Sequence, residues 1–168
     1  GTDDITALGT WIATQFDTTL NWKDVEWIRS IWPGKLILKG ILDAEDAEQA
    51  TKTGAQALVV SNNGGRQLDG AVSPLRVLPD VVQAVGSDFP VMMDSGVRRG
   101  TDVLKALALG AKFVFVGRPF GYAAAVAGEA GVRHAIRILA DEVQRDLGLL
   151  GVPSIQGLGP EQLHPVPH

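Results

Sequence analysis

Four short apolar segments of this sequence each end in a residue whose side chain could do chemistry. These residues are Lys39, Ser61, Asp94 and Arg118. An apolar run that stops abruptly at polar residues is typical of a parallel strand buried on both faces, which delivers side chains to a site at its carboxyl end. The plainer alternatives are an exposed loop lysine at Lys39 and a strand-capping hydroxyl at Ser61.

The segment that follows the second apolar run carries several functional groups close together. It reads Ser61-Asn62-Asn63-Gly64-Gly65-Arg66-Gln67-Leu68-Asp69. The two glycines let the backbone turn sharply or approach a ligand closely, and the planar fork of Arg66 suits a carboxylate or a phosphate. Two plainer interpretations stay open, an ordinary glycine-rich turn and a salt bridge from Arg66 to Asp69.

Two further segments have the composition of an anion site. After the third apolar run the sequence continues Asp94-Ser95-Gly96-Val97-Arg98-Arg99 into a predicted helix. Backbone N–H groups and the helix dipole at such a start attract anions. Gly117-Arg118 follows the fourth run in the same manner. One arginine near a helix start is often a surface residue, but two at the same point of the repeat predict phosphate binding.

Strands and helices alternate through most of the chain. Residues 1–20 have no clean period and are expected to hold at most a short helical turn, whereas 21–32 are typical of a helix with Asn21 as its N-cap. The repeat that follows contains expected strands at 35–40, 58–61, 89–94 and 112–118, and expected helices at 43–53, 73–85, 101–109, 119–127 and 131–147. This alternation calls for parallel strands with right-handed crossovers. An open doubly wound sheet and part of a (β/α)8 barrel both fit, and a complete barrel needs at least ~200 residues.

The composition excludes several classes of function. The chain has 168 residues, and its net charge of -4 with no basic stripe argues against nucleic-acid binding. Cysteine is absent, so disulfides, thiolate metal sites and a cysteine nucleophile are excluded, and no metal site is expected. No apolar run reaches the ~18 residues of a membrane span, and the first residues do not resemble a signal peptide. A cytoplasmic protein is expected.

The segment Ser61–Asp69 resembles the active-site signature Ser-Asn-His-Gly-Gly-Arg-Gln-Leu-Asp of the FMN-dependent 2-hydroxy acid oxidases and dehydrogenases, which include glycolate oxidase, L-lactate dehydrogenase and mandelate dehydrogenase. Eight of the nine residues match. The resemblance runs from about residue 15 to 163 and implies an α/β fold in which residues 1–168 are the C-terminal half, strands five to eight, of a (β/α)8 TIM barrel. The N-terminal half is then expected on a separate chain or fragment. A homo-oligomer, commonly a tetramer in the family, and peripheral membrane association through the missing half are further expectations.

The resemblance also implies FMN as the cofactor and a role for each polar strand end. Lys39 would lie beside the flavin N1 and C2 carbonyl, where its charge stabilises reduced FMN, and Ser61 would lie on the flavin pyrimidine edge. Arg66 would bind the substrate carboxylate through a bidentate pair. The phosphate would be held by two arginines, Arg98 and Arg118, and by the amides near Gly96 and Gly117. The remaining cofactor-binding positions are thus Asp94, Ser95, Gly96, Val97, Arg98, Gly117 and Arg118.

The one residue of the signature that does not match is its third, the family's catalytic histidine, and here it is Asn63. In the family this base takes a proton from the 2-hydroxy acid as electrons pass to FMN, and histidine suits the task because its pKa lies near neutral. Asparagine has no titratable group, and His134, His164 and His168 end no predicted strand. General-base catalysis contributes about 10²–10⁴ in rate, so turnover is expected to be impaired. An engineered substitution, natural divergence to another task and an error in the sequence would each explain Asn63.

The predicted function is FMN-dependent oxidation of an (S)-2-hydroxy acid to the 2-keto acid, with a lactate-, glycolate- or mandelate-like substrate. Lys39, Asn63 and Arg66 would form the catalytic centre, with Asn63 and Arg66 in contact with the substrate, and oxygen, a quinone or a cytochrome would reoxidise the flavin. Two alternatives stay open. One is a catalytically silent barrel that binds FMN or a phosphate ligand. The other is a different phosphate-binding barrel enzyme, such as isopentenyl-diphosphate isomerase or IMP dehydrogenase, against which Arg66 argues.

Overall fold

A computed structural model describes residues 4–164 of the chain. The chain divides into two compact units, Gly1–Gly34 and Lys35–His168. The sheet and all the predicted site residues belong to the second unit. His168, one of the three histidines, lies outside the described residues.

The first unit contains two helices, α1 (Ile5–Ala13) and α2 (Trp22–Ile31). The carboxylate of Asp4 accepts backbone N–H groups of the first turn and caps α1, which is longer than the short turn expected there. Asn21 caps α2 as predicted, and the Asp24 carboxylate accepts the Asn21 N–H at 2.8 Å to complete a capping box.

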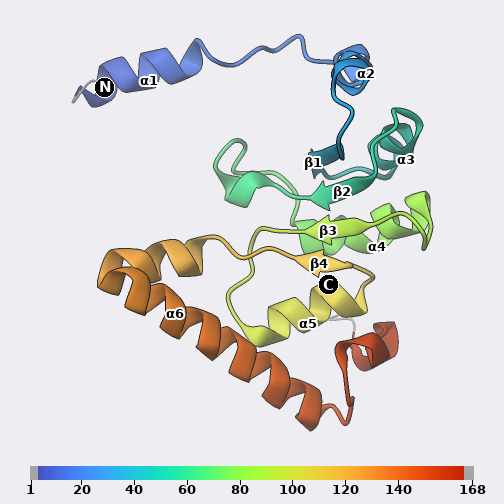
Figure 1. Ribbon diagram of the computed structural model, residues 1–168, viewed down its shortest axis with the longest axis vertical. Helices are drawn as coiled ribbons and strands as arrows, with labels where there is room; N and C mark the ends of the chain where they lie inside the picture. Colours follow the sequence, from blue (N-terminus) through green and yellow to red (C-terminus); the bar gives the residue numbers. More distant parts are fainter. Residues whose placement is uncertain (1–3, 165–168) are drawn as a thin grey trace. The chain divides into compact units, whose positions relative to one another are not determined.

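Four parallel strands lie side by side in the second unit, in the order β1-β2-β3-β4 (Figure 1). They are β1 (Ile37–Ile41), β2 (Ala57–Val60), β3 (Val91–Met93) and β4 (Phe113–Val114). Consecutive strands pair in parallel register, with Leu58 opposite both Leu38 and Val91. The order and direction of the strands confirm the predicted strand–helix repeat.

The fourth strand is shorter than the predicted 112–118. Its partner within the described residues is the short β3, and the ladder ends with the hydrogen bond from Phe115 N to Met93 O (2.9 Å). The chain then turns at Gly117 into α6 (Arg118–Leu149). The residues predicted to extend the strand therefore line a cavity at its end.

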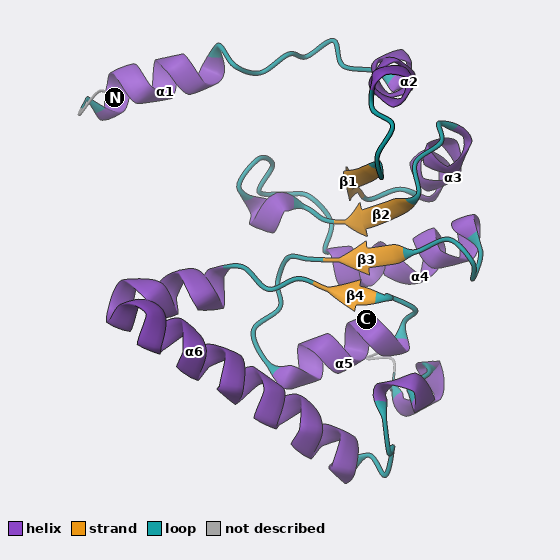
Figure 2. Cartoon of the chain, in the orientation of Figure 1, coloured by secondary structure: helices purple, strands orange, loops and turns teal. Residues whose placement is uncertain are grey.

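Helices connect the strands as predicted (Figure 2). They are α3 (Ala44–Lys52), α4 (Pro74–Val85) and α5 (Gly100–Ala108). The two helices predicted at 119–127 and 131–147 both form. They are the two parts of α6, which meet at a kink where Ala127 (φ -147°) and Gly128 (φ 56°) have non-helical backbone. None of the described helices combines the length and the apolarity that crossing a membrane requires.

The core of the second unit lies where α3, α4 and α5 pack against the sheet. Its largest fully buried side chains are Leu58, Val60, Leu78, Val81, Val91 and Met93. The two outer strands, in contrast, keep apolar side chains in the open: Ile37 of β1 is 47% exposed and Phe113 of β4 is 55% exposed. Each of these strands pairs with a neighbour on one side only. Exposed apolar side chains on such strands are expected when the sheet is a segment of a larger, closed sheet. This architecture agrees with the predicted half barrel.

Candidate active site

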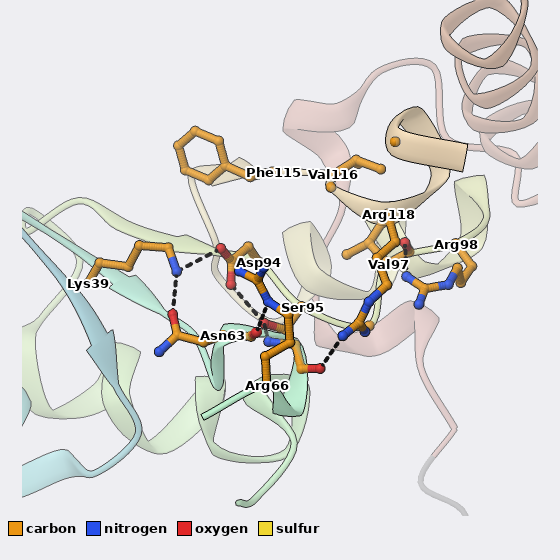
Figure 3. Close-up of a pocket in the computed structure, with 14 residues that line it drawn as sticks. Lys39, Asn63, Arg66, Asp94, Ser95, Val97, Arg98, Phe115, Val116 and Arg118 are labelled. Atoms are coloured by element: carbon orange, nitrogen blue, oxygen red, sulfur yellow. Dashed lines mark hydrogen bonds and ion pairs between the residues drawn. The ribbon is translucent and has the colours of Figure 1, made fainter. Parts of the chain in front are cut away.

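The carboxyl ends of the strands open into one cavity of about 400 Å³ (Figure 3). Its walls come from β1, from the turn η1 (Asn63–Gly65), from the loop after β3 and from the segment that leads from β4 into α6. Every predicted site residue lines it except Ser61, which is 1% exposed and bonds to a lining side chain. Phe115, Val116 and Gly121 also line it. The early end of β4 brings these three residues into the wall, and no pattern in the sequence indicates that.

Lys39 is the centre of the polar network in this cavity. A register shift follows it in β1, where Gly40 adopts φ 102°. The ammonium donates to Ser61 Oγ (2.9 Å) and Asn63 Oδ1 (2.9 Å). It also forms an ion pair with Asp94 Oδ2 (3.1 Å). An ammonium has three N–H donors, so these three oxygens hold Lys39 in the site rather than free in a loop.

Among the described residues that line the cavity, Asp94 is the one with a carboxylate side chain. Burial acts to raise the pKa of this carboxyl, but hydrogen bonds from Ser61, Ser95 and Lys39, together with the Lys39 charge, hold the pKa below its ordinary value. The Ser95 hydroxyl donates to Asp94 Oδ1 at 2.8 Å. Asp94 is therefore ionised at neutral pH, partly balances Lys39, and is a weak proton acceptor.

Asn63 lies in a backbone turn of unusual conformation. Asn63 (φ 55°), Gly64 (φ 69°) and Gly65 (φ 72°) are all left-handed, a region that glycine adopts freely and asparagine tolerates. Because an ammonium can only donate, the Asn63 atom that faces Lys39 is the amide oxygen, and the amide NH2 is left as a donor. Residue 63 therefore offers the cavity an amide donor and no ring nitrogen. Neither His134 nor His164 lines the cavity.

Ser95 joins the loop after β3 to the turn η1. Its φ of 75° is left-handed, a region that glycine adopts more readily than serine does. The hydroxyl accepts the Gly64 N–H at 3.0 Å while it donates to Asp94. The serine side chain thus ties the two loops together, a role that the sequence does not reveal.

Arg66 is anchored to the turn that precedes it. Its Nε donates to the backbone oxygen of Asn63 at 3.1 Å, and its side chain lines the cavity. Within the described part of the chain no ion pair joins Arg66 to Asp69, so the salt-bridge alternative does not hold. The guanidinium lies in the cavity wall, where it can meet an anion.

Two arginines form the side of the cavity opposite Lys39 (Figure 3). Arg118 Nη2 donates to the backbone oxygen of Gly64 at 2.6 Å, and Arg98 Nη1 donates to Val97 O at 3.1 Å. A Cβ at Gly64 would lie 3.2 Å from the Arg118 guanidinium, so the glycine allows this close approach. Two guanidinium groups on one wall are a suitable partner for a phosphate.

The N-terminus of α5 does not contribute to anion binding in the way the sequence predicts. Asp102 Oδ2 accepts the N–H groups of Arg98 (2.9 Å) and Arg99 (3.0 Å), and Glu142 Oε2 of α6 accepts that of Gly100 (2.8 Å). The prediction is wrong for these three amides, because two carboxylates of the protein already satisfy them. The side chains of Arg98 and Arg118 and the amides near Gly96 and Gly117 stay the predicted anion-binding groups, and all four residues line the cavity.

Glu142 is a buried carboxylate that sequence reasoning missed. The Arg99 guanidinium approaches its Oε1 at 2.7 Å, so Arg99 bonds to α6 while Arg98 lines the cavity. The hydrogen bonds from Arg99 and from the Gly100 N–H, which outweigh burial, lower the pKa of Glu142. Glu142 fixes α6 against the start of α5.

A cationic cavity at the carboxyl ends of parallel, helix-connected strands places the molecule among α/β-barrel proteins with a site for an anionic ligand. The chain belongs to the FMN-dependent dehydrogenase family, whose model matches residues 1–165. It is 51% identical over 146 residues to the L-lactate dehydrogenase of Pseudomonas syringae pv. syringae (strain B728a), and 48% identical over 153 residues to that of Yersinia pestis (strain Pestoides F). These alignments cover 87% and 91% of this chain but only 38% and 40% of the relatives.

Two solved structures also match most of this chain but over less than half of their own length. The monotopic membrane protein (S)-mandelate dehydrogenase matches with a TM-score of 0.88 at 42% identity, over 97% of this chain and 43% of its own. Mandelate oxidase with (S)-2-phenylpropionate matches with a TM-score of 0.77 at 48% identity, over 82% of this chain and 41% of its own. The family assignment and the half-barrel fold class predicted from the sequence are therefore confirmed.

The family depends on FMN, and the donor chemistry of the cavity fits that cofactor. FMN has an anionic phosphate and an isoalloxazine ring whose pyrimidine edge gains negative charge on reduction. Arg98 and Arg118 supply cations on one side of the cavity, and Lys39 supplies one on the other. The chain thus places positive charge at two separate points, as the two charged parts of FMN require.

Proposed function

We propose that the complete protein oxidises an (S)-2-hydroxy acid to the 2-keto acid and that this chain provides the FMN-binding and substrate-binding half of the site. The observation that carries the proposal is the meeting of Lys39, Asn63 and Arg66 with two arginines in one cavity. Relatives named L-lactate dehydrogenase and structures of mandelate dehydrogenase and oxidase support the substrate class. Lactate- and mandelate-like acids are therefore the first substrates to test.

In this proposal FMN, when bound, supplies the two-electron oxidation chemistry. Arg98 and Arg118 would hold its phosphate, and Lys39 would bind the pyrimidine edge with Ser61 and Asp94 behind it. Arg66 would hold the substrate carboxylate by two parallel hydrogen bonds. This clamp would orient the substrate C2 toward the cofactor and leave the C2 hydroxyl near residue 63.

The proposed reaction lacks an evident acceptor for the proton of the substrate hydroxyl. Oxidation of a 2-hydroxy acid removes this proton, and Asn63 cannot take it because an amide does not titrate near neutral pH. Asp94 is a poor substitute, since its donors lower its pKa. We therefore propose impaired turnover. A catalytically silent FMN-binding barrel is the second candidate, and Asn63 is the observation that favours it.

We also propose that the outer strands of the sheet pack against a second half of the barrel. The exposed apolar side chains of the outer strands would be covered by the N-terminal half of the same barrel, on a separate chain or fragment. Assembly of the completed barrel into a homo-oligomer belongs to the same proposal. We further propose a cytoplasmic location, with peripheral membrane association through the other half of the barrel. The likeness to the monotopic membrane protein (S)-mandelate dehydrogenase supports that association.

An absorption spectrum of the complete protein tests the proposal. Bound flavin, followed by slow anaerobic bleaching on addition of L-lactate or (S)-mandelate, is the expected result. Bound flavin that no 2-hydroxy acid bleaches would favour the silent binder. A colourless protein that cannot be loaded with FMN would contradict both candidates.

A further inference from the structure

We propose that the cavity, as Asn63 shapes it, binds a 2-keto acid more tightly than the corresponding 2-hydroxy acid. The inference rests on the proposed function and concerns the ligand that this same site prefers. It follows from the hydrogen-bond donors and acceptors that the described residues place around the cavity.

The orientation of the Asn63 amide is the first step. Lys39 Nζ lies 2.9 Å from Asn63 Oδ1, and an ammonium has no lone pair with which to accept. The amide oxygen is therefore bound to Lys39, and the side chain can offer a ligand only its NH2 donor. A neutral histidine at this position would instead offer a ring nitrogen that accepts a proton.

The second step is that three of the backbone carbonyls in the wall already have a donor from the protein. An arginine side chain donates to each of three carbonyl oxygens along the cavity. These pairs are Arg66 with Asn63 O (3.1 Å), Arg118 with Gly64 O (2.6 Å) and Arg98 with Val97 O (3.1 Å). The same contacts that position the guanidinium groups thus occupy the carbonyls.

The side-chain acceptors of the wall also have donors from the protein. Asp94 Oδ1 accepts the Ser95 hydroxyl at 2.8 Å, and Oδ2 pairs with the Lys39 ammonium at 3.1 Å. Ser95 Oγ accepts the Gly64 N–H while its own proton goes to Asp94. The wall that this chain contributes is consequently rich in donors and poor in acceptors.

The charge of the lining side chains acts in the same direction. With FMN bound, Arg98 and Arg118 would face its phosphate and Lys39 its flavin ring, which leaves the Arg66 guanidinium and the Asn63 NH2, both donors, to meet the acid. A ligand matched to such a wall has oxygen atoms that only accept. The carboxylate and C2 carbonyl of a 2-keto acid meet that condition, and the hydroxyl of a 2-hydroxy acid adds a proton that needs an acceptor. Leaving a donor unsatisfied in a desolvated site weakens binding by about tenfold or more.

Ligand titration of the complete, FMN-loaded protein tests the inference. The change in flavin absorbance on rapid mixing, before any bleaching, gives the dissociation constants of pyruvate against L-lactate and of benzoylformate against (S)-mandelate. We expect the keto acid to bind about tenfold tighter in each pair. In Asn63→His the preference should shrink by about the same factor, because the ring nitrogen accepts the hydroxyl proton. Arg66→Lys should weaken both acids of each pair and leave their ratio unchanged.

The outcomes separate this inference from the proposed function. Equal binding of the two acids, or tighter binding of the hydroxy acid, overturns the inference and leaves the proposed function standing. If neither acid of either pair perturbs bound flavin, the cavity is not a 2-hydroxy acid site, and the proposed function fails together with the inference.

Discussion

Replacement of Asn63 by histidine should restore the missing proton acceptor without disrupting the turn that carries it. Asn63 has a left-handed backbone (φ 55°), which histidine tolerates better than most residues. The substitution removes one of three contacts of Lys39, whose bonds to Ser61 and Asp94 remain. Because the Lys39 side chain is 48% exposed, we expect the loss to cost no more than about 0.5–1.5 kcal/mol of stability.

The rate of flavin reduction should respond far more strongly. A positioned general base contributes about 10²–10⁴ in rate, so Asn63→His in the complete protein should reduce its flavin at least ~10²-fold faster with the preferred acid. The positive charge of Lys39 nearby favours the neutral imidazole, and the rate should rise with pH as that imidazole loses its proton. Rapid-mixing measurements of flavin bleaching from about pH 5 to 9 follow both effects.

Asn63→Gln is the matched control, because it keeps the amide and adds no titratable group. It should stay slow and show no new pH dependence. If Asn63→His reduced its flavin no faster than Asn63→Gln, while both bound FMN and the acid, residue 63 would not lie at the proton-transfer position and the reasoning would be refuted.

Three further predictions concern stability and assembly. Gly100→Ala should destabilise the complete protein by about 1–3 kcal/mol in urea unfolding, because a Cβ there would lie 2.6 Å from Glu142 Cβ. Gly70→Ala is the control and should change stability little, because a Cβ at Gly70 would have nothing within 4 Å. Equal effects of the two substitutions would disprove the close packing of α5 on α6. Since the pKa of Asp94 is below its ordinary 3.8 in the folded protein, its contribution to stability is present above that value and is lost as the pH falls through the folded pKa. The wild type should therefore lose more stability than Asp94→Asn in acid unfolding titrations, and parallel curves would contradict the network. Residues 1–168 expressed alone should bind no FMN and should aggregate, and a cooperative, flavin-binding monomer in size-exclusion chromatography would argue against the half-barrel account.

The strands, and most of the residues that gather at the cavity, were predictable from the sequence. Short apolar runs that end in polar residues identify buried parallel strands, and the structure places Lys39, Ser61 and Asp94 at adjacent strand ends within hydrogen-bonding distance. Local signals such as Asn21 before α2 also predicted helices correctly. These features depend on neighbours in the chain, which a single sequence displays.

Contacts between distant segments were not predictable in the same way. The bond from Arg118 to Gly64 O spans 54 positions, and that from Gly100 N to Glu142 spans 42. Nothing in the sequence distinguishes Glu142 from the other charged residues of a long helix, so its capture of an α5 amide could be seen only in the structure. The early end of β4, which follows from pairing with the short β3, is a property of the sheet rather than of residues 112–118.

FMN bound in the cavity would have its phosphate beside Arg118, and a comparison of FMN with riboflavin tests this placement. Each charge-assisted contact to the phosphate is worth about 1.5–3 kcal/mol, so Arg118→Ala in the complete protein should weaken FMN binding by about 10- to 100-fold. Riboflavin lacks the phosphate and reports only the lost contact to Gly64 O, so its affinity should fall much less. Fluorescence titration of both flavins into wild type and variant gives all four constants. An equal loss for the two ligands would show that Arg118 is not at the phosphate and would contradict the account.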